Sequence, residues 1–366
     1  MSFRKNISWL LFPLTGWYAV CVWLRNVAFD LGLLRQDAPH VVTIGVGNLV
    51  SGGTGKTPMV EHLVRLLAAE HRVALLSRGY RRSTKGFVLH EGEPDPRCIG
   101  DEAAMMALKF PELTVAVCEK RSEGIHRLMA LPEPPDVVLL DDAFQHRFVK
   151  PSLNILLTEY ASPYYNDYIL PFGDLREFRT ARYRANIVIV TKSPANLKPI
   201  DKHNIVNSLH LKPYQKVFFS YIGYGEPISV ADGTVRPLAT DDQVLLVTGI
   251  AHPEPLAAEL RKTHKVTQLR YADHHNYTRR DMASIASALE QLGGENRVVI
   301  TTEKDAVKMR PLLAENPSLP VYYIPIETRF HPSGDYSLDS QVLSLVRENG
   351  HFLSKLRTSA LSSDKY

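Results

Sequence analysis

Hydrophobic and polar residues follow one another along the chain in blocks that predict alternating strands and helices. Short, unbroken apolar runs are typical of strands buried on both faces, and longer amphipathic stretches are typical of helices. The predicted strands cover 41–46, 72–77, 113–118, 136–140, 153–157, 186–191, 244–248, 297–302 and 321–324. The predicted helices cover 59–70, 101–110, 121–131, 253–262 and 279–292. This alternation predicts an α/β protein with parallel sheets and helices on both faces.

The pattern changes once, near residue 216, where two β-type runs follow each other without a helix. Residues 216–222 and 228–235 are separated by Gly-Glu-Pro and predict a two-stranded hairpin. A length of 366 residues is enough for about two domains. The predicted regions are an N-terminal helical region (1–36), a first domain (37–215), a two-stranded β linker (216–240), a second, smaller α/β domain (241–352) and a polar tail (353–366).

The N-terminal apolar run, Ile7 to Leu24, is close to the minimum length that spans a bilayer. No small-residue cleavage site follows it, so a signal peptide is not indicated. Pro13 and Gly16 interrupt the run, and a spanning helix, an interfacial helix and a core helix all remain open. Aromatic residues and flanking cations favour a helix that lies in the membrane surface; these are Trp9, Trp17, Tyr18, Trp23, Arg4, Lys5 and Arg25.

Residues 47–57, Gly-Asn-Leu-Val-Ser-Gly-Gly-Thr-Gly-Lys-Thr, lie between a predicted strand and a predicted helix, as a P-loop does. Val50 stands where the strict P-loop pattern has glycine, and Gly52 and Gly53 are expected to form the tight turn instead. Backbone N–H groups of such a loop surround a polyphosphate, and the helix start adds a positive dipole end. Lys56 would reach the β- and γ-phosphates and Thr57 would ligate Mg²⁺. The predicted nucleotide-binding residues are Gly52, Gly53, Thr54, Gly55, Lys56 and Thr57.

Two acidic pairs are candidates for the chemistry of a nucleoside triphosphate. Asp141 and Asp142 end a buried strand, where an acid of a P-loop fold holds Mg²⁺ directly or through water. Asp101 and Glu102 begin a predicted helix. Asp101 could take the proton of an attacking hydroxyl or simply cap the helix, and the local sequence leaves both interpretations open.

Two further clusters have several interpretations. In Asp273-His274-His275 the aspartate could orient an imidazole, although such a pair is also common on surfaces, and no third ligand at metal-site spacing accompanies it. The arginines of 78–82 and 176–184 suit phosphates, a solvated basic face or anionic lipid head groups, and composition does not choose among these.

Composition narrows the class of protein. Hydrophobic residues make up 45% of the chain, which is enough for ordinary cores. A net charge of +4 is too small to indicate nucleic acid as a partner. The three cysteines are scattered, so neither a disulfide framework nor a zinc site is indicated, and a reducing cytosol is expected. Nothing in the sequence calls for an obligate protein partner.

Taken together in this order, the motifs resemble those of the tetraacyldisaccharide 4′-kinase family, which phosphorylates lipid A precursors. The resemblance runs from the N-terminal apolar helix to about residue 310. It rests on seven segments: 47–58, Ser77-Arg78-Gly79-Tyr80, Gly100-Asp101-Glu102, Asp141-Asp142-Ala143-Phe144-Gln145-His146, 170–177, Asp273-His274-His275 and Thr301-Thr302-Glu303-Lys304-Asp305-Ala306.

The resemblance implies transfer of the γ-phosphoryl group of ATP to the 4′-hydroxyl of a tetraacylated glucosamine disaccharide 1-phosphate. It implies a P-loop-type α/β/α sandwich domain and a smaller α/β/α domain joined by a two-stranded β linker, with the active site in the cleft between them. It also implies a membrane-associated N-terminal helix and a place at the cytoplasmic face of the inner membrane.

The resemblance further assigns roles to residues. Asp101 would be the base, helped by His274, and Lys56 and Thr57 would hold phosphate and Mg²⁺ with Asp141 and Asp142 at the metal. The residues that match family positions near the reacting groups or the substrate are Glu102, Arg121, His146, Arg176 and Glu177.

The departures from the family pattern are Ala103, Ala143, Asp174 and Phe178, and none removes a reacting group. The alternative function is a membrane-associated P-loop ATPase of the partitioning or targeting class. Such proteins usually carry a second lysine early in the loop, and this chain has Ser51 before Gly52, which favours the kinase.

Overall fold

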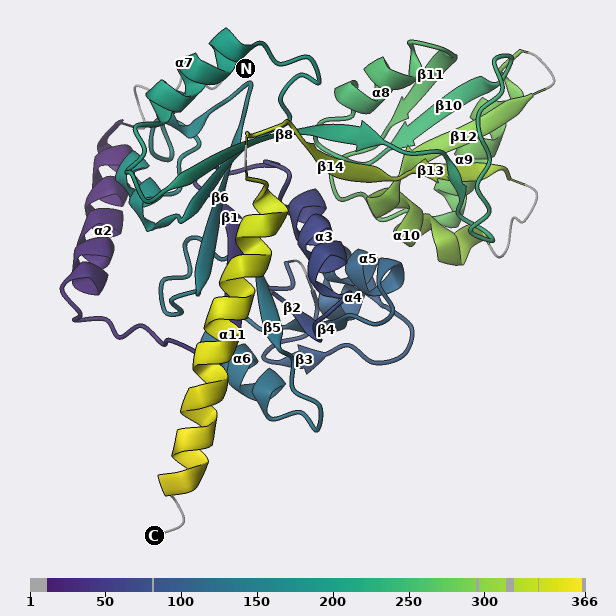
Figure 1. Cartoon of the computed structure of the whole chain (residues 1–366). Coiled ribbons are helices and arrows are strands. Elements are labelled where there is room, and N and C mark those ends of the chain that lie inside the picture. Colours follow the sequence, from purple (N-terminus) through teal and green to yellow (C-terminus); the bar gives the residue numbers. More distant parts are fainter. Residues whose placement is uncertain (1–11, 81, 294–295, 314–318, 335, 364–366) are drawn as a thin grey trace. The chain divides into compact units, whose positions relative to one another are not determined.

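The structure is a computed structural model that describes residues 12–80, 82–293, 296–313, 319–334 and 336–363, with side chains between residues 13 and 350. The chain divides into two compact units, which are drawn in Figure 1. Unit 1 comprises residues 1–99, 106–222 and 328–366, and unit 2 comprises residues 100–105 and 223–327.

Unit 1 is built on a sheet with the strand order β14-β8-β7-β6-β1-β5-β2-β4-β3. The pairings from β8 to β4 are parallel, and β3 pairs antiparallel with β4. The strands are β1 (Val42–Asn48), β2 (Val73–Ser77), β3 (Val88–Leu89), β4 (Thr114–Val117), β5 (Val137–Asp141), β6 (Leu153–Glu159), β7 (Ile187–Thr191), β8 (Lys216–Tyr224) and β14 (Ile326–Phe330).

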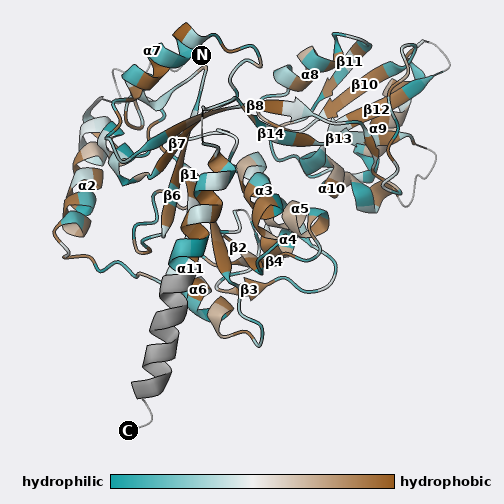
Figure 2. Cartoon of the chain, in the orientation of Figure 1, coloured by the Kyte–Doolittle hydropathy of each residue, from teal (hydrophilic) through white to brown (hydrophobic). Residues whose placement is uncertain are grey.

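The α-helices that accompany this sheet are α2 (Phe12–Asp30), α3 (Lys56–Leu67), α4 (Pro96–Ile99), α6 (Arg121–Met129), α7 (Pro199–Leu209) and α11 (Leu338–Ser363). Helix α5 (Asp101–Lys109) crosses the division, with residues 101–105 in unit 2 and residues 106–109 in unit 1. Two 3₁₀ turns, Tyr164–Asn166 and Arg179–Arg184, lie in the connections around β7. Fully apolar strands such as β7 are buried along their whole length, and Figure 2 shows their hydrophobic character. Burial on both faces explains why these strands do not alternate in sequence.

Unit 2 is a smaller α/β/α layer structure with the strand order β11-β10-β12-β13-β9. On β10, Leu245 and Val247 pack with α9 and α10, whereas Val244 and Leu246 pack with α8 on the other face. This alternation places helices on both sides of the sheet. The elements are β9 (Ile228–Ser229), β10 (Gln243–Thr248), α8 (Glu254–Leu260), β11 (Lys265–Arg270), α9 (Arg279–Glu290), β12 (Arg297–Thr302), α10 (Glu303–Leu313) and β13 (Val321–Ile324).

The α/β class and the parallel sheets confirm the sequence prediction, but the predicted hairpin between 216–222 and 228–235 is wrong. Strand β8 pairs with β7 and β14, and β9 pairs with β13. The second predicted strand, 228–235, is not one continuous strand, because its two ends, Ile228 and Val235, face each other across an isolated antiparallel bridge. The two strands shared by the units therefore come from residues 216–224 and 326–330, which are far apart in sequence.

The end of the chain also differs from the prediction of a polar tail from residue 353. Helix α11 continues to Ser363 and crosses the predicted boundary at 352. Leu338, Val342 and Val346 are buried at a spacing of four residues, which fits one face of a helix docked on unit 1. The division into units places this helix with unit 1, whereas the sequence prediction assigned residues up to 352 to the second domain.

Helix α2 covers the C-terminal two thirds of the predicted N-terminal apolar run, and Ile7 to Leu11 lie outside the described residues. Across the described part of the chain, no helix combines the length and the apolar character that crossing a bilayer requires. Large apolar side chains on and just after α2 are nevertheless exposed: Leu14, Trp17, Val20, Trp23, Leu24, Leu31 and Leu33.

Candidate active site

The phosphate-binding loop joins β1 to α3 at the centre of the unit 1 sheet. Strand β1 is wholly buried between β5 and β6, so the loop starts from a rigid element. Gly52 and Gly55 have φ values of 128° and 83°, which glycine adopts without steric cost. The Asn48 side-chain amide donates to Thr54 Oγ1 at 2.8 Å, and Thr191 Oγ1 donates to the Thr54 carbonyl oxygen at 2.8 Å. These contacts hold the loop in shape before any ligand binds.

Lys56 and Thr57 are the first two residues of α3, where unpaired N–H groups and the helix dipole favour an anion. Lys56 Nζ lies 3.5 Å from Asp142 Oδ1. Asp141 ends β5 opposite Val46 of β1, and Asp142 follows with a φ of 46°. The register of two neighbouring parallel strands thus brings the lysine and the acidic pair together, as the sequence predicted.

Arg176 completes this group from a distant part of unit 1. Its guanidinium group contacts both carboxylate oxygens of Asp142, at 3.1 Å and 3.2 Å, and donates to the Val50 carbonyl oxygen at 3.2 Å. Burial alone would raise the pKa of Asp142, but Lys56 and Arg176 outweigh burial and hold this pKa below its usual value. Asp142 is therefore an anion at neutral pH.

Arg121 begins α6 and is only 2% exposed. Its guanidinium group donates to the carbonyl oxygens of Cys118 and Asp141, each at 2.8 Å. Burial lowers the pKa of Arg121, and the nearby carboxylates of Asp141 and Asp142 oppose that effect. Arg121 thus ties the end of β4 to the end of β5 and supports the backbone that presents the acidic pair.

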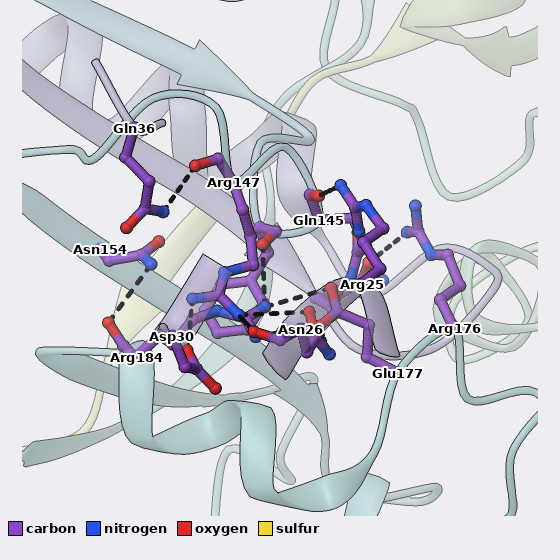
Figure 3. Close-up of polar contacts among 12 residues, drawn as sticks. Arg25, Asn26, Asp30, Gln36, Gln145, Arg147, Asn154, Arg176, Glu177 and Arg184 are labelled. Carbon is purple, nitrogen blue, oxygen red and sulfur yellow. Dashed lines mark hydrogen bonds and ion pairs between the residues drawn. The ribbon is translucent and has the colours of Figure 1, made fainter. Parts of the chain in front are cut away.

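Glu177 has a different environment from its neighbour Arg176. The Glu177 carboxylate is buried and accepts from Arg184 at 2.9 Å and 3.1 Å and from the Asn26 amide at 3.1 Å. Figure 3 shows these side chains together with other polar residues of α2 and of the loops that α2 contacts. In unit 1, Glu177 therefore belongs to the docking site of helix α2.

Further polar contacts anchor α2 in the same region. Arg147 pairs with Asp30 at 2.6 Å, and Arg25 donates to the Gln145 carbonyl oxygen at 2.9 Å. The Tyr18 hydroxyl donates to the Arg176 carbonyl oxygen at 3.0 Å. One side of the helix is thus bound to the segments that carry Asp142 and Arg176.

His146 follows Gln145, whose carbonyl oxygen accepts from Arg25. Its ring packs edge-on against Phe148, and within the part of the chain that the structure describes its Nδ1 atom is buried without a hydrogen-bond partner. Burial, with a smaller contribution from the charge of Arg121, lowers the pKa of His146 to about 4. The imidazole is therefore neutral at pH 7.

A second group of candidate residues lies in unit 2. Asp101 and Glu102 begin α5, where the helix dipole favours negative charge, and Gly100 precedes them with a φ of 88°. His274 Nδ1 lies 3.0 Å from Asp101 Oδ2. His274 has a φ of 61°, an uncommon conformation for a side-chain-bearing residue, and its N–H donates to the Gly249 carbonyl oxygen at 3.0 Å.

The structure thus forms two groups from the predicted residues. Lys56, Asp141, Asp142, Arg121 and Arg176 gather at the phosphate-binding loop of unit 1, and Asp101, Glu102 and His274 gather in unit 2. The role of Asn48 in holding Thr54 was not predicted from the sequence.

Three lysines that contact these groups were not predicted to be site residues, although Lys304 lies in one of the seven segments. Lys192 donates to the Gly53 carbonyl oxygen at 2.5 Å, and Lys304 and Lys308 contact Glu102 and Asp101. For the last two, the spacing of four residues places both on one face of a helix, but no helix was predicted over these residues from the sequence.

Comparisons with known proteins agree with this geometry. Residues 7–347 match the sequence model of the family described as tetraacyldisaccharide-1-P 4′-kinase. A tetraacyldisaccharide 4′-kinase of Bacteroides thetaiotaomicron is 43% identical over 362 residues, covering 95% of each chain. One of Parabacteroides distasonis is 45% identical over 335 residues, covering 88% of this chain and 90% of that protein.

A solved structure gives the same result for the fold. LpxK from Aquifex aeolicus, crystallised in complex with ATP, aligns with a TM-score of 0.72 at 25% sequence identity. The alignment covers 94% of this chain and 99% of that one.

Proposed function

Because the chain belongs to the tetraacyldisaccharide-1-phosphate 4′-kinase family, we propose that it phosphorylates the 4′-hydroxyl of a tetraacylated glucosamine disaccharide 1-phosphate with ATP. The observation that carries this proposal is the group at the end of β1, where a P-loop lysine and an arginine converge on Asp142. Such a group suits phosphoryl transfer, in which positioning and neutralisation of charge supply most of the catalysis. The rival function, a partitioning-type ATPase, is not favoured, because the family match spans nearly the whole chain.

Unit 1 carries the residues that bind ATP, the phosphoryl donor. Backbone N–H groups of residues 52–57 surround the phosphates, and Lys56 follows at the helix start where its ammonium group reaches the terminal phosphate. Arg176, already oriented by Val50 and Asp142, is a second cation for the charge of the transferring group. The bond between the γ-phosphorus and the β–γ bridging oxygen breaks, and ADP leaves.

The residues around the loop also fit a magnesium ion. Thr57, Asp141 and Asp142 offer hydroxyl and carboxylate oxygens, the ligands that Mg²⁺ prefers, and Mg²⁺ is usually held by one or two carboxylates together with substrate phosphates. Asp142 is ionised, as a ligand must be. When bound, the ion would neutralise charge on the phosphate oxygens.

Asp101 is the residue that acts on the acceptor hydroxyl group. Its carboxylate would take the proton of the 4′-hydroxyl as that oxygen forms its bond to the γ-phosphorus. His274, held in a left-handed conformation by its contact with Gly249, orients the carboxylate through Oδ2. General-base catalysis of this kind typically contributes about 10²- to 10⁴-fold.

The exposed side of α2 supports a place at the membrane surface. Polar residues of this helix form hydrogen bonds with other segments of unit 1, while Trp17 and Trp23 are 72% and 55% exposed. Amphipathic aromatic rings of this kind settle at the boundary between head groups and acyl chains. We propose that α2 lies in the cytoplasmic surface of the inner membrane, where the lipid substrate would be met.

The direct test of the function uses the full chain, γ-labelled ATP, Mg²⁺ and purified tetraacyldisaccharide 1-phosphate. We expect a product with one added phosphate on the 4′ position, and an Asp101→Asn variant slower by about 10²- to 10⁴-fold. Asp241→Asn, an exposed acid of unit 2, is the matched control and should behave as wild type. Turnover of ATP that does not depend on the lipid would contradict the proposal and support the rival function.

A further inference from the structure

The junction of β12 and α10 carries a motif that the proposed function leaves without a role, Thr301-Thr302-Glu303-Lys304-Asp305-Ala306. Thr302 Oγ1 accepts from the Asp305 N–H at 3.2 Å and donates to Asp305 Oδ2 at 2.8 Å. Asp305 is fully buried and accepts from the Gly249 N–H at 3.0 Å. The start of α10 is therefore fixed against the end of β10, which is also the anchor of His274.

Two lysines of this helix contact the acidic pair of α5. Lys304 and Lys308 are four residues apart and so lie on one face. Lys308 Nζ is 2.7 Å from Asp101 Oδ2, and Lys304 Nζ is 2.7 Å from Glu102 Oε1. Both pairs lie within unit 2, because residues 100–105 belong to it.

The Lys308 ammonium group is well removed from water. Its side chain is only 7% exposed, compared with 23% for Lys304, and Nζ also donates to the His275 carbonyl oxygen at 3.3 Å. A charge pair shielded in this way interacts more strongly than an exposed one. Removing one partner leaves an uncompensated charge, so the Asp101 carboxylate depends on Lys308.

Lys308 and His274 meet on the same oxygen of Asp101. Both contacts are made to Oδ2, at 2.7 Å and 3.0 Å. With one carboxylate oxygen held from two directions, the plane of the carboxylate is fixed, and so is the direction of Oδ1. A base that is oriented in this way loses little entropy when the hydroxyl arrives.

We propose that Lys308 is a positioning residue for phosphoryl transfer, which holds Asp101 ionised through Oδ2 and leaves Oδ1 to receive the proton of the acceptor hydroxyl. The proposal rests on the proposed function, in which Asp101 is the base. It gives the motif at the start of α10 a task, because the motif fixes the helix that carries Lys308.

The groups around Asp101 set its pKa, so removal of the Lys308 ammonium group can be detected as a change in that pKa. The charged or titratable groups in contact with the Asp101 carboxylate are Lys308 from α10 and His274 from the segment after β11. Around them lie Asp273, which is 4.0 Å from His274, Lys304, which pairs with Glu102, and His275, whose carbonyl oxygen accepts from Lys308. Burial raises the pKa of Asp101, but hydrogen bonds from Lys308 and His274, together with the positive charges of Lys308 and Lys304, outweigh burial, so the net pKa is lowered. Without Lys308, burial meets less opposition and the pKa rises.

The test is the pH profile of kcat/KM for Lys308→Met, Lys308→Gln and Lys308→Arg with tetraacyldisaccharide 1-phosphate as acceptor. The base works as a carboxylate, so activity falls on the acidic side as Asp101 is protonated. We expect the acidic limb of the two neutral variants to move to higher pH by about one unit or more, and the arginine variant to stay near wild type. Lys262→Met, an exposed lysine of the same unit, is the matched control and should leave the profile unchanged.

Other outcomes would overturn the proposal. A neutral variant that loses the same fraction of activity at every pH would indicate a purely structural role. If one neutral variant does not fold, the other two profiles still decide, since arginine must keep the acidic limb in place and the remaining neutral residue must move it. Asp101→Asn is measured in parallel: full activity there would reject Asp101 as the base, whereas an inactive Asp101→Asn with unshifted Lys308 profiles would reject only the role of Lys308.

Discussion

Gly47 lies so close to Phe144 that a β-carbon on Gly47 would come within 2.7 Å of Phe144 Cβ and 2.8 Å of the Phe144 backbone nitrogen. Gly47 is near the end of β1, and Phe144 lies two residues after Asp142. The absence of a side chain at position 47 therefore allows the segment that carries the acidic pair to pack against the strand that leads into the phosphate-binding loop.

We expect Gly47→Ala to destabilise the protein by about 1–3 kcal/mol, because the added methyl group must push back a buried backbone segment. Chemical denaturation of the wild type and the variant measures this change. Gly16→Ala is the control: Gly16 has no atom within 4 Å of an added β-carbon and lies inside α2, so the substitution should be neutral or slightly stabilising. Equal stability of wild type and Gly47→Ala would show that residues 143–146 can shift to accommodate the added methyl group without a cost in free energy.

Replacing Arg176 by lysine should lower kcat/KM by about 10- to 100-fold. Lysine keeps the charge but loses the planar fork that contacts both oxygens of Asp142. Steady-state kinetics with ATP and the lipid acceptor measure the effect. The control is Arg179→Lys, since Arg179 donates to the Asp167 carbonyl oxygen instead of the acidic pair. Wild-type kinetics for Arg176→Lys would show that the bidentate contact is dispensable.

The stability of the protein should depend on pH through His146. Its pKa is lowered to about 4 in the folded chain, and the unfolded chain has the ordinary value near 6.5. The stabilisation is therefore complete above about pH 6.5 and is lost as the pH falls from there towards 4, because the unfolded state binds a proton first.

We expect the stability difference between wild type and His146→Gln to change by about 2 kcal/mol in favour of the variant between pH 7.5 and pH 5. Urea denaturation of both proteins at the two pH values measures this change, and comparing the pair cancels the other groups that titrate. A constant difference would mean that folding does not lower the pKa of His146.

The exposed apolar side of α2 should govern binding to lipid. We expect the double variant Trp17→Ser/Trp23→Ser to bind vesicles of anionic phospholipid at least about 10-fold more weakly, because two large apolar side chains no longer enter the interface. Vesicle co-sedimentation of the full chain measures binding. Val235→Ser, at an exposed apolar residue of unit 2, should bind as wild type does. Undiminished binding of the double variant would reject α2 as the contact.

The phosphate-binding region could be predicted from the sequence because its parts are local. Strand β1, the glycine-rich loop and the start of α3 are contiguous in sequence, and the glycines predict the turn between them. Asp141 and Asp142 could be predicted too, since an unbroken apolar strand ends at them and parallel strands present their ends at one edge.

The rest depended on contacts between distant residues. Strand β14 joins β8 across about a hundred residues, and the nearby run at 228–235 offered a competing partner with the same β-type pattern. Arg176 was predicted from the family resemblance, but its hydrogen bonds to Asp142 and Val50 follow from the fold alone. Lys308 was missed because no local pattern shows that α10 faces the start of α5.

Helix α2 has a practical consequence for anyone who wants a readily handled form of this protein. Removing the helix would strip Asn26 from Glu177, Asp30 from Arg147 and Tyr18 from the backbone of Arg176. Truncation would thus expose a row of unsatisfied polar groups beside the phosphate-binding loop. Detergent-free preparations are better sought by exchanging the outward-facing tryptophans and leucines for polar residues while the helix itself is kept.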